Sequence, residues 1–523
     1  MRAWLTLALL AAGCTSAPRV EPPRELTAAE RSGYEATSTY EEVMGFLGSV
    51  SQRADGVHLT SFGTSVEGRG LPLAVWGAPA ASAEAIRSTG KTRVLVFSNI
   101  HAGEVAGKEA ALMLVRDLAD GRHAAWADSL VVLVAPIYNA DGNERIAPGN
   151  RGPQLGPIRG MGERPNAMGL DLNRDFAKLM APESRALVGL LRDVDPHVVV
   201  DLHTTNGTHM GYHLTYAPPL SPNTPPALDA LLRDEWLPQI SAEILRTDSM
   251  ATDHYGNVPG AFGGGTRGIP RGWYSFSPQA RFSTNYTGLR GRIGILSEAY
   301  SYAPFDERVH VTKRFVEEIL AAAWRDASRV RELTAAADAA PVVGSELAVR
   351  ASFVAPESTR EILMGAVDTL AHPVTGAPML RRREVRTPET MPVFSRFGPT
   401  ETVAAPAAYL VPRELAAVLD LLEHHGIRTG GEQPAGRVQR FRVDSTRIAR
   451  QPFQNVRAQE VFGGWVSDDS ASADDVTVPV NQPLGRLVVA LLEPRSDDGV
   501  LAWAFPGALD TDAERVAIRR VVP

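Results

Sequence analysis

The 523-residue sequence has little of three things: cysteine, excess positive charge and long apolar runs. Its single cysteine allows no disulfide within the chain and excludes zinc sites built from several thiolates. Lysine and arginine number 53 against 60 acidic residues, so a nucleic-acid binder that relies on bulk positive charge is excluded. No internal stretch approaches the roughly eighteen apolar residues needed to cross a bilayer. The composition is that of a globular protein of about two to four domains.

The single cysteine, Cys14, follows a segment with the features of an export signal. A positive charge, an apolar run over residues 3–12 and small residues suited to cleavage precede it. The pattern resembles a bacterial lipoprotein signal, in which the cysteine after the cut carries lipid; an ordinary signal peptide is the alternative. We expect residues 1–13 to be a signal peptide and residues 14–36, rich in proline and charge, to be a lipidated tether.

This expectation concerns location as well as processing. It places the protein outside the cytoplasm, either anchored by lipid on the outer-membrane or periplasmic side of a bacterium or secreted. Thr15, which follows the cysteine, favours the outer membrane by the same resemblance. The membrane contact would be the lipid alone, since nothing in the sequence predicts a spanning helix.

Residues 37–340 alternate between short β-branched runs and helical stretches. The runs suit strands buried on both faces and lie at residues 71–77, 92–100, 129–137, 197–203 and 292–300. The main helical stretches lie at residues 105–120, 182–194 and 311–337. This alternation predicts an α/β domain whose mixed, mostly parallel sheet has helices on both faces.

The pattern changes near residues 335–346. Beyond that point short β runs dominate, at residues 346–354, 436–444 and 486–494, and one amphipathic helix spans residues 412–426. We therefore expect residues 346–523 to form a β-rich accessory domain with one helix.

Polar side chains capable of metal chemistry follow the predicted strands. His101 and Glu104 come directly after one strand, His203 ends another and Glu298 lies in a third. Each alone is more often structural, as a core histidine, a solvated pair or a strand-end charge. Together they fall at the strand ends of one domain, where open parallel sheets bind ligands. Two histidines and one glutamate suit zinc and leave a position for water, and a further carboxylate could take a proton from that water.

The segments around these residues resemble the zinc carboxypeptidase family, of the carboxypeptidase A-like kind. The resemblance covers about residues 90–300. It is carried by NIHAGEVAG (99–107), APIYNADGNER (135–145), GERPNAMGLDLNRDF (162–176), VVVDLHTTNG (198–207) and GILSEAY (294–300).

The resemblance implies one zinc ion per chain, bound by His101, Glu104 and His203. It implies that Asp171 accepts the outer ring N–H of His101, which fixes the tautomer of that ring. Glu298 would be the general base that activates the zinc-bound water and later protonates the leaving amine.

The same resemblance implies how substrate is held. Arg164 would polarise the scissile carbonyl, and Asn173 and Arg174 would grip the terminal carboxylate of the peptide. Tyr274 and Tyr286 are both candidates for the family's mobile tyrosine, because both precede the predicted base.

The expected function is therefore a zinc metallocarboxypeptidase that acts on peptides with a free C-terminal carboxylate. One alternative is an amidase or endopeptidase of the same fold that cuts cell-wall peptides. Another is a binding lipoprotein without catalysis, which the presence of the complete set of metal ligands and the base disfavours.

Overall fold

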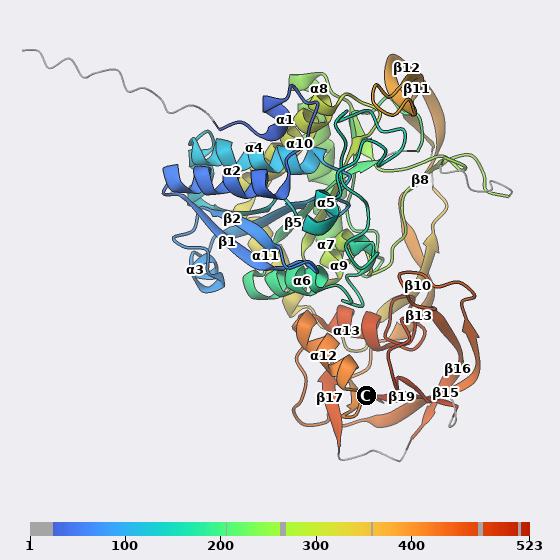
Figure 1. Ribbon diagram of the computed structural model, residues 1–523. Coiled ribbons are helices and arrows are strands. Elements are labelled where there is room, and N and C mark those ends of the chain that lie inside the picture. The colour runs from blue at the N-terminus through green and yellow to red at the C-terminus, as the bar shows by residue number, and fades with distance from the viewer. Residues whose placement is uncertain (1–24, 206, 262–267, 357–358, 469–473, 511–513) are drawn as a thin grey trace, which may run out of the picture.

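The computed structural model describes residues 25–205, 207–261, 268–356, 359–468, 474–510 and 514–523 (Figure 1). The predicted signal peptide, Cys14 and the first part of the predicted tether lie outside these residues. Among the described residues, no helix combines the length and the apolar character that a membrane span requires.

The core of the N-terminal half, residues 25–340, is an eight-stranded sheet in the order β1-β2-β4-β3-β5-β9-β6-β7. The four central strands β4, β3, β5 and β9 are parallel. β1 and β2 are antiparallel to each other, β2 is antiparallel to β4, and β6 is antiparallel to β9 but parallel to the edge strand β7. The strands are β1 (Val57–Thr64), β2 (Gly70–Trp76), β3 (Thr92–Ser98), β4 (Leu130–Ala135), β5 (Val198–Thr205), β6 (Leu214–Ala217), β7 (Thr252–His254) and β9 (Ile293–Tyr300). The predicted mixed, mostly parallel sheet is confirmed.

Helices cover both faces of this sheet. One apolar cluster packs α2, α4, α8, α10 and α11 on one face, and another packs α3, α6 and α9 on the other. Because both faces are covered, β4 and β5 are buried along their whole length, as their unbroken apolar and β-branched runs predict.

The helices of this half are α1 (Ala28–Arg31), α2 (Tyr40–Arg53), α3 (Ala83–Ser88), α4 (Ala106–Ala119), α5 (Ala140–Glu144), α6 (Pro182–Val194), α7 (Pro226–Ala230), α8 (Leu237–Asp248), α9 (Ser283–Leu289), α10 (Phe305–Arg325) and α11 (Ala327–Ala339). The predicted helix over residues 311–337 is thus part of two helices, which meet at Asp326.

The C-terminal half contains further sheets. One sheet is the pair β10 and β13. A second is the long hairpin β11–β12, which pairs with β8 of the N-terminal half. The third has the order β16-β15-β19-β14-β17, with β18 beside β19. The elements are β8 (Trp273–Tyr274), β10 (Glu346–Phe353), β11 (Thr359–Ala371), β12 (Pro378–Phe394), β13 (Phe397–Ala404), β14 (Ala408–Pro412), α12 (Ala416–His425), β15 (Arg437–Ile448), β16 (Gln459–Ser467), β17 (Asp475–Pro479), α13 (Gly485–Leu492), β18 (Leu509–Asp510) and β19 (Arg515–Val522). Figure 1 shows the β11–β12 hairpin extending along the N-terminal half.

Two sequence-based expectations about local structure are wrong. The apolar run at residues 486–494 forms most of the helix α13, because a short continuous apolar run suits a buried helix as well as a buried strand. Residues 25–36, which were expected to be part of the tether, pack against the rest of the N-terminal half. There α1 buries Ala28 and Ala29, and Glu30 pairs with Arg116 at 2.6 Å. The structure therefore places the start of the folded protein earlier than residue 37.

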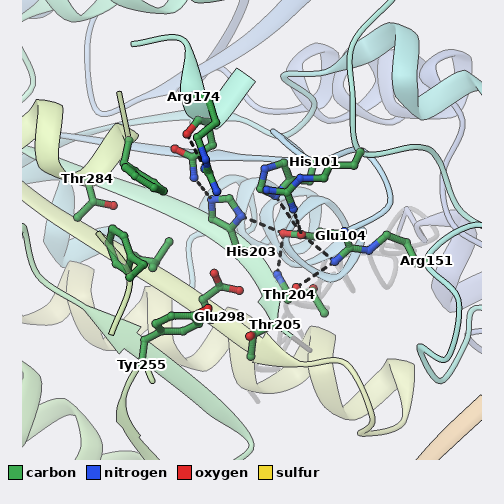
Figure 2. Close-up of a pocket in the computed structure, with 15 residues that line it drawn as sticks. His101, Glu104, Arg151, Arg174, His203, Thr204, Thr205, Tyr255, Thr284 and Glu298 are labelled. Carbon is green, nitrogen blue, oxygen red and sulfur yellow. Dashed lines mark hydrogen bonds and ion pairs between the residues drawn. The ribbon is translucent and has the colours of Figure 1, made fainter. Parts of the chain in front are cut away.

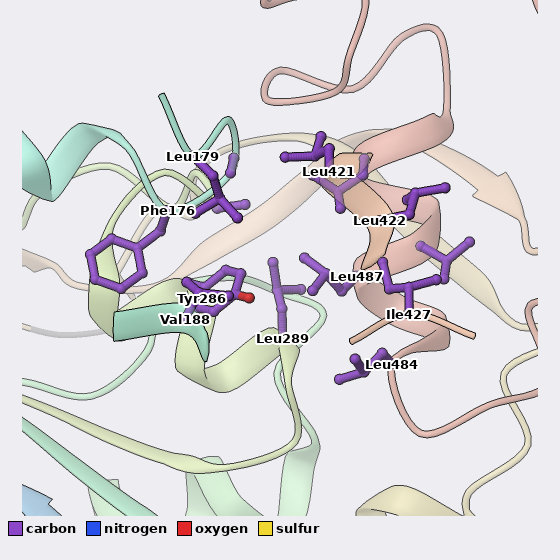
Figure 3. Close-up of a cluster of buried hydrophobic side chains, with 14 of the residues drawn as sticks. Phe176, Leu179, Val188, Tyr286, Leu289, Leu421, Leu422, Ile427, Leu484 and Leu487 are labelled. Carbon is purple, nitrogen blue, oxygen red and sulfur yellow. The ribbon is translucent and has the colours of Figure 1, made fainter. Parts of the chain in front are cut away.

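The predicted accessory domain shares one hydrophobic core with the N-terminal half. Figure 3 shows Phe176, Leu179 and Tyr286 of the N-terminal half packed toward Leu421 and Leu487 of the C-terminal half. The change in composition near residue 340 therefore marks a change of architecture, while the apolar packing continues across it.

His425, the last residue of α12, contacts residues of the N-terminal half within this core. Its side chain is fully buried; Nδ1 lies 2.7 Å from the Tyr286 hydroxyl and Nε2 lies 3.2 Å from the carbonyl of Ala177. A carbonyl only accepts, so Nε2 carries the hydrogen, and Nδ1 accepts from the tyrosine. Burial lowers the pKa of His425 to about 3, with Arg290 adding to the effect, so the ring is neutral in the folded protein.

We predict that the His425 contact weakens the fold on acidification. Below about pH 6.5, His425 binds a proton in the unfolded chain but stays neutral in the folded one. The free energy of unfolding therefore falls as the pH drops towards 3. At pH 5.5 this costs about 1.4 kcal/mol. The loss of Tm between pH 7 and pH 5.5, followed by circular dichroism, should be smaller in His425→Gln. An equal loss in both proteins contradicts the assignment.

Candidate metal and substrate site

The three predicted metal ligands meet at the carboxyl end of the central strands. His101 and Glu104 lie in the turn between β3 and α4, and His203 lies in β5, which is the neighbour of β3. Nδ1 of His101 is 3.0 Å from Glu104 Oε1, and Nδ1 of His203 is 2.9 Å from Glu104 Oε2 (Figure 2). The potential ligand atoms all lie within 4.8 Å of one another.

This geometry fits a zinc ion. Ligand atoms about 2.0 Å from zinc at tetrahedral angles lie about 3.3 Å apart, close to the separations between Glu104 and the two rings. Two imidazoles and one carboxylate leave the fourth position open. Among the described residues, this is the one group of histidine and carboxylate side chains arranged to hold a metal ion.

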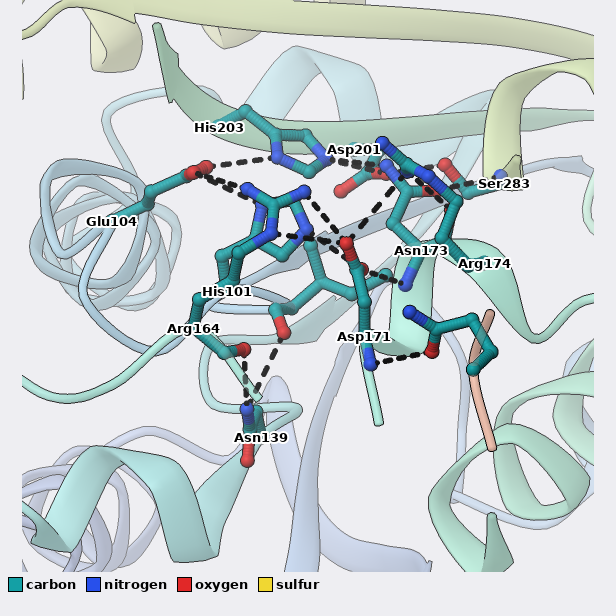
Figure 4. Close-up of polar contacts among 12 residues, drawn as sticks. His101, Glu104, Asn139, Arg164, Asp171, Asn173, Arg174, Asp201, His203 and Ser283 are labelled. Carbon is teal, nitrogen blue, oxygen red and sulfur yellow. Dashed lines mark hydrogen bonds and ion pairs between the residues drawn. The ribbon is translucent and has the colours of Figure 1, made fainter. Parts of the chain in front are cut away.

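The outer nitrogen of each ring is held by a buried carboxylate (Figure 4). His101 Nε2 is 2.9 Å from Asp171 Oδ1, and His203 Nε2 is 2.9 Å from Asp201 Oδ2. Each carboxylate accepts the ring hydrogen, which leaves the lone pair of Nδ1 directed at the metal position. Asp201 was not expected from the sequence, although its place two residues before His203 puts both on one face of β5.

The Glu104 carboxylate is 3% exposed and remains ionised. Burial alone would raise its pKa, but His101 and Arg151 hold that pKa well below its usual range. The Arg151 guanidinium donates to Oε1 at 2.8 Å, and the amide of Thr204 donates to Oε2 at 3.0 Å. Arg151 carries no motif of its own, so the sequence offered no signal for it.

Glu298 lies beside the metal ligands. It is the register partner of His203 on the parallel strands β5 and β9, and its carboxylate faces the pocket (Figure 2). Burial raises the pKa of Glu298 to about 8, and the negative charges of Glu104 and Asp201 add to the effect. A carboxyl group with a pKa near neutrality is suited to proton transfer.

A cavity of about 350 Å³ opens over these residues. Three arginines, Arg151, Arg164 and Arg174, line it together with Asn173. The remaining wall includes the apolar and hydroxyl side chains of Thr205, Tyr255, Phe276, Phe282, Thr284 and Leu296. Arg164, Arg174 and Asn173 all contact Asp171, and we call this group the cationic side of the pocket; Arg151 instead pairs with Glu104.

The predicted substrate-binding residues are brought together on the cationic side. Arg164 donates to Asp171 Oδ2 through Nε at 3.0 Å and Nη2 at 2.7 Å. The Arg174 guanidinium lies 4.1 Å from the centre of the Phe282 ring, and Asn173 Oδ1 accepts from the amide of Ser283 at 2.9 Å. Both arginines are oriented by contacts that do not involve substrate.

Comparison with known families covers the part of the chain that holds these ligands. Residues 44–224 match the family described as zinc carboxypeptidase. The match spans 181 of the 523 residues, about a third of the chain. It includes the three metal-ligand candidates and residues 162–176, but it ends before Glu298. The placement of Glu298 in the site therefore rests on its register with His203.

Curated proteins similar to part of the chain include fungal and mammalian proteins. Carboxypeptidase 2 of Trichophyton rubrum is 32% identical over 143 residues, which are 27% of this chain and 23% of that protein. Carboxypeptidase D of Mus musculus is 30% identical over 159 residues, covering 26% of this chain and 12% of that protein. The chain thus spans about a quarter of the first relative's length and less of the second.

Solved structures of carboxypeptidases also resemble the chain at lower similarity. A metallo-carboxypeptidase from Burkholderia cenocepacia is 17% identical with a TM-score of 0.40, covering 54% of this chain and 69% of that one. Thrombin activatable fibrinolysis inhibitor is 15% identical with a TM-score of 0.42, covering 58% of this chain and 81% of that one.

Neither tyrosine expected to be mobile lines the pocket. Tyr286 is fully buried in α9 against His425, and Tyr274 lies in β8 with its ring stacked 4.2 Å from that of Phe394. Both expectations are corrected, because the C-terminal half, whose position the sequence did not show, holds both rings. The tyrosine in the pocket is Tyr255, just after β7.

We predict that the protein releases protons when it binds zinc at pH 7. Burial raises the pKa of Glu298 to about 8; His203 also has a raised pKa, because Asp201 and Glu104 outweigh the opposing effect of burial. A nearby cation lowers both values, so protons leave. Titration calorimetry in two buffers of different ionisation enthalpy measures this release. It should be smaller in Glu298→Gln, and a zinc-binding heat independent of buffer contradicts the prediction.

Proposed function

We propose that the protein is a zinc-dependent carboxypeptidase that removes residues from the C-terminus of peptides. The observation that carries the proposal is the meeting of His101, Glu104 and His203 with Glu298 in one cavity that is also lined by Arg164, Asn173 and Arg174. The match of residues 44–224 to the zinc carboxypeptidase family supports it.

The cationic side of the cavity supports recognition of a free carboxylate. Arg174 presents a planar guanidinium that can bind both oxygens of a carboxylate, and Asn173 lies beside it. The ring of Phe282 beneath Arg174 restricts the guanidinium to one position, which reduces the entropy lost when substrate binds. A substrate end fixed in this way presents its last peptide bond to the metal ligands and Glu298.

Glu298 supports the proton transfers of hydrolysis. A zinc ion held by the three ligands would supply Lewis acidity towards water and the substrate carbonyl. The Glu298 carboxylate accepts the proton of the attacking water and delivers it to the nitrogen of the leaving amine. The surrounding burial keeps the proton affinity of this carboxylate high enough for both steps.

Arg164 supports stabilisation of the oxygen that becomes negative during the attack. Its guanidinium lines the cavity and is held by Asp171, so it is oriented before substrate arrives. A donor placed in advance in this way contributes about 2.7–4 kcal/mol to the transition state in comparable sites.

The first prediction of this proposal concerns Glu298. We expect Glu298→Gln to bind zinc stoichiometrically but to lower kcat by at least about 100-fold, because the amide cannot accept the proton. Metal content by atomic absorption and turnover of an unblocked dipeptide substrate measure the two effects. A variant with normal turnover removes Glu298 as the base.

The second prediction separates exopeptidase from endopeptidase activity. Arg174→Ala should raise KM for peptides with a free C-terminus by about 10- to 100-fold, since a charge-assisted contact contributes about 1.5–3 kcal/mol. Amide-capped peptides should be cleaved poorly by both proteins and change little. Arg174→Lys, which keeps the charge without the planar fork, should fall between them. Equal effects on free and capped peptides contradict the carboxylate role.

We also propose that the protein is exported and held at a bacterial membrane by lipid on Cys14. The proposal rests on the sequence of the first 14 residues. Labelling of the expressed protein with radioactive palmitate, lost in Cys14→Ser, would support it; an unlabelled, freely secreted wild-type protein would contradict it.

A further inference from the structure

The strip of residues 170–174 lies between the candidate site and the C-terminal half of the protein. Leu170 and Leu172 are fully buried in the core shared by the two halves. Asp171 and Asn173 alternate with them and reach the two histidines on the other side. The strip is therefore in contact with the C-terminal half on one side and with the candidate site on the other.

Asp171 is the most connected residue of the strip (Figure 4). Its Oδ1 accepts from His101 Nε2 at 2.9 Å and from the amide of Asn173 at 2.9 Å, while Oδ2 accepts from Arg164. The backbone N–H of Asp171 donates to Gln454 Oε1 at 2.8 Å, across 283 positions of sequence. This last contact comes from the C-terminal half, in the loop between β15 and β16.

The loop holds Gln454 in an unusual backbone conformation. Gln454 has φ of 51° and Asn455 has φ of 61°, in the left-handed region that residues with a side chain seldom adopt. Such a conformation persists only where neighbouring contacts enforce it. Here the backbone groups of Phe453 and Val456 bond each other, with N···O distances of 2.8 and 3.0 Å.

A second contact fixes the same loop to the wall of the pocket. Arg281, next to the pocket residue Phe282, lies beside the stacked rings of Phe453 and Trp503, 5.5 and 5.0 Å from their centres. Its guanidinium also pairs with the buried carboxylate of Asp498 at 2.8 Å. The loop around Gln454 is thus anchored to two segments that line the pocket.

We propose that Gln454 is a positioning residue of the active site and that the C-terminal half thereby completes that site. By fixing the peptide of Asp171, Gln454 sets the direction of the carboxylate that orients both His101 and Arg164. The inference rests on the proposed function in one respect: the two side chains it positions are those assigned to the metal and to the substrate carbonyl.

The test replaces the acceptor and keeps the length of the side chain. Gln454→Met should weaken zinc binding about tenfold, at the lower end of the effect of losing a direct partner of a metal ligand. It should also lower kcat/KM about tenfold for a peptide with a free C-terminus. Zinc affinity is measured by competition with a chelator, which does not depend on turnover. Gln454→Glu keeps an acceptor oxygen and should recover most of both losses.

A matched control removes the same kind of contact elsewhere. Gln482 Oε1 also accepts a backbone N–H at 2.8 Å, that of Arg428, but within the C-terminal half and away from the pocket. Gln482→Met should lower Tm while zinc affinity and kcat/KM stay at the wild-type values. Gln454→Met should lower zinc affinity and kcat/KM while its Tm stays at the wild-type value.

The outcomes distinguish the inference from the function on which it rests. A wild-type protein that binds no zinc and cleaves no peptide overturns the proposed function. A wild-type protein that does both, with Gln454→Met unchanged, overturns the positioning role alone. Equal losses of zinc affinity in Gln454→Met and Gln482→Met also overturn it, because they indicate a general effect on folding.

Discussion

The carboxylate of Asp171 connects the metal-binding side of the pocket with its cationic side. One oxygen accepts from His101 and the other accepts from Arg164, so a single rigid group sets the directions of both. The arrangement depends on burial, because in a site of low dielectric a carboxylate that lost these donors would be strongly destabilised. The pKa of Asp171 is well below its usual range: burial would raise it, but His101, Arg164 and Arg174 outweigh that effect.

The pocket is a local exception to the charge of the whole protein. The chain carries a net charge of −7, yet three arginines converge on one cavity. The carboxylates of Glu104 and Glu298 line the same cavity, and a bound cation would complete the balance of charge. In the proposed function Arg174, 3.9 Å from Asp171 Oδ2, would meet the anionic group of the substrate.

Two segments on either side of the central sheet support the metal ligands. At the N-terminal side, Glu109 of α4 accepts from the amide of Ser38 at 2.7 Å, which fixes the helix that begins after Glu104. At the C-terminal side, the strip of residues 170–174 packs on the core shared with α12 and α13. The metal ligands are therefore supported by two segments that lie outside the central sheet.

The sequence by itself determined the parts of the protein that repeat a local pattern. The apolar runs of β3, β5 and β9 identified the parallel sheet, and the polar residues at their ends identified His101, Glu104, His203 and Glu298, because parallel strands bring such ends to one edge. The resemblance to the zinc carboxypeptidase family implied the roles of Asp171 and of the neighbouring arginine and asparagine side chains.

Only the tertiary structure decided the contacts between segments far apart in the chain. Arg151 and Tyr255 lie in the pocket without any motif, Tyr286 is turned into the core by His425, and Gln454 reaches Asp171 across 283 positions. The physical reason is that periodicity reports which face of an element is buried, whereas the partner that covers that face depends on the packing of the whole chain.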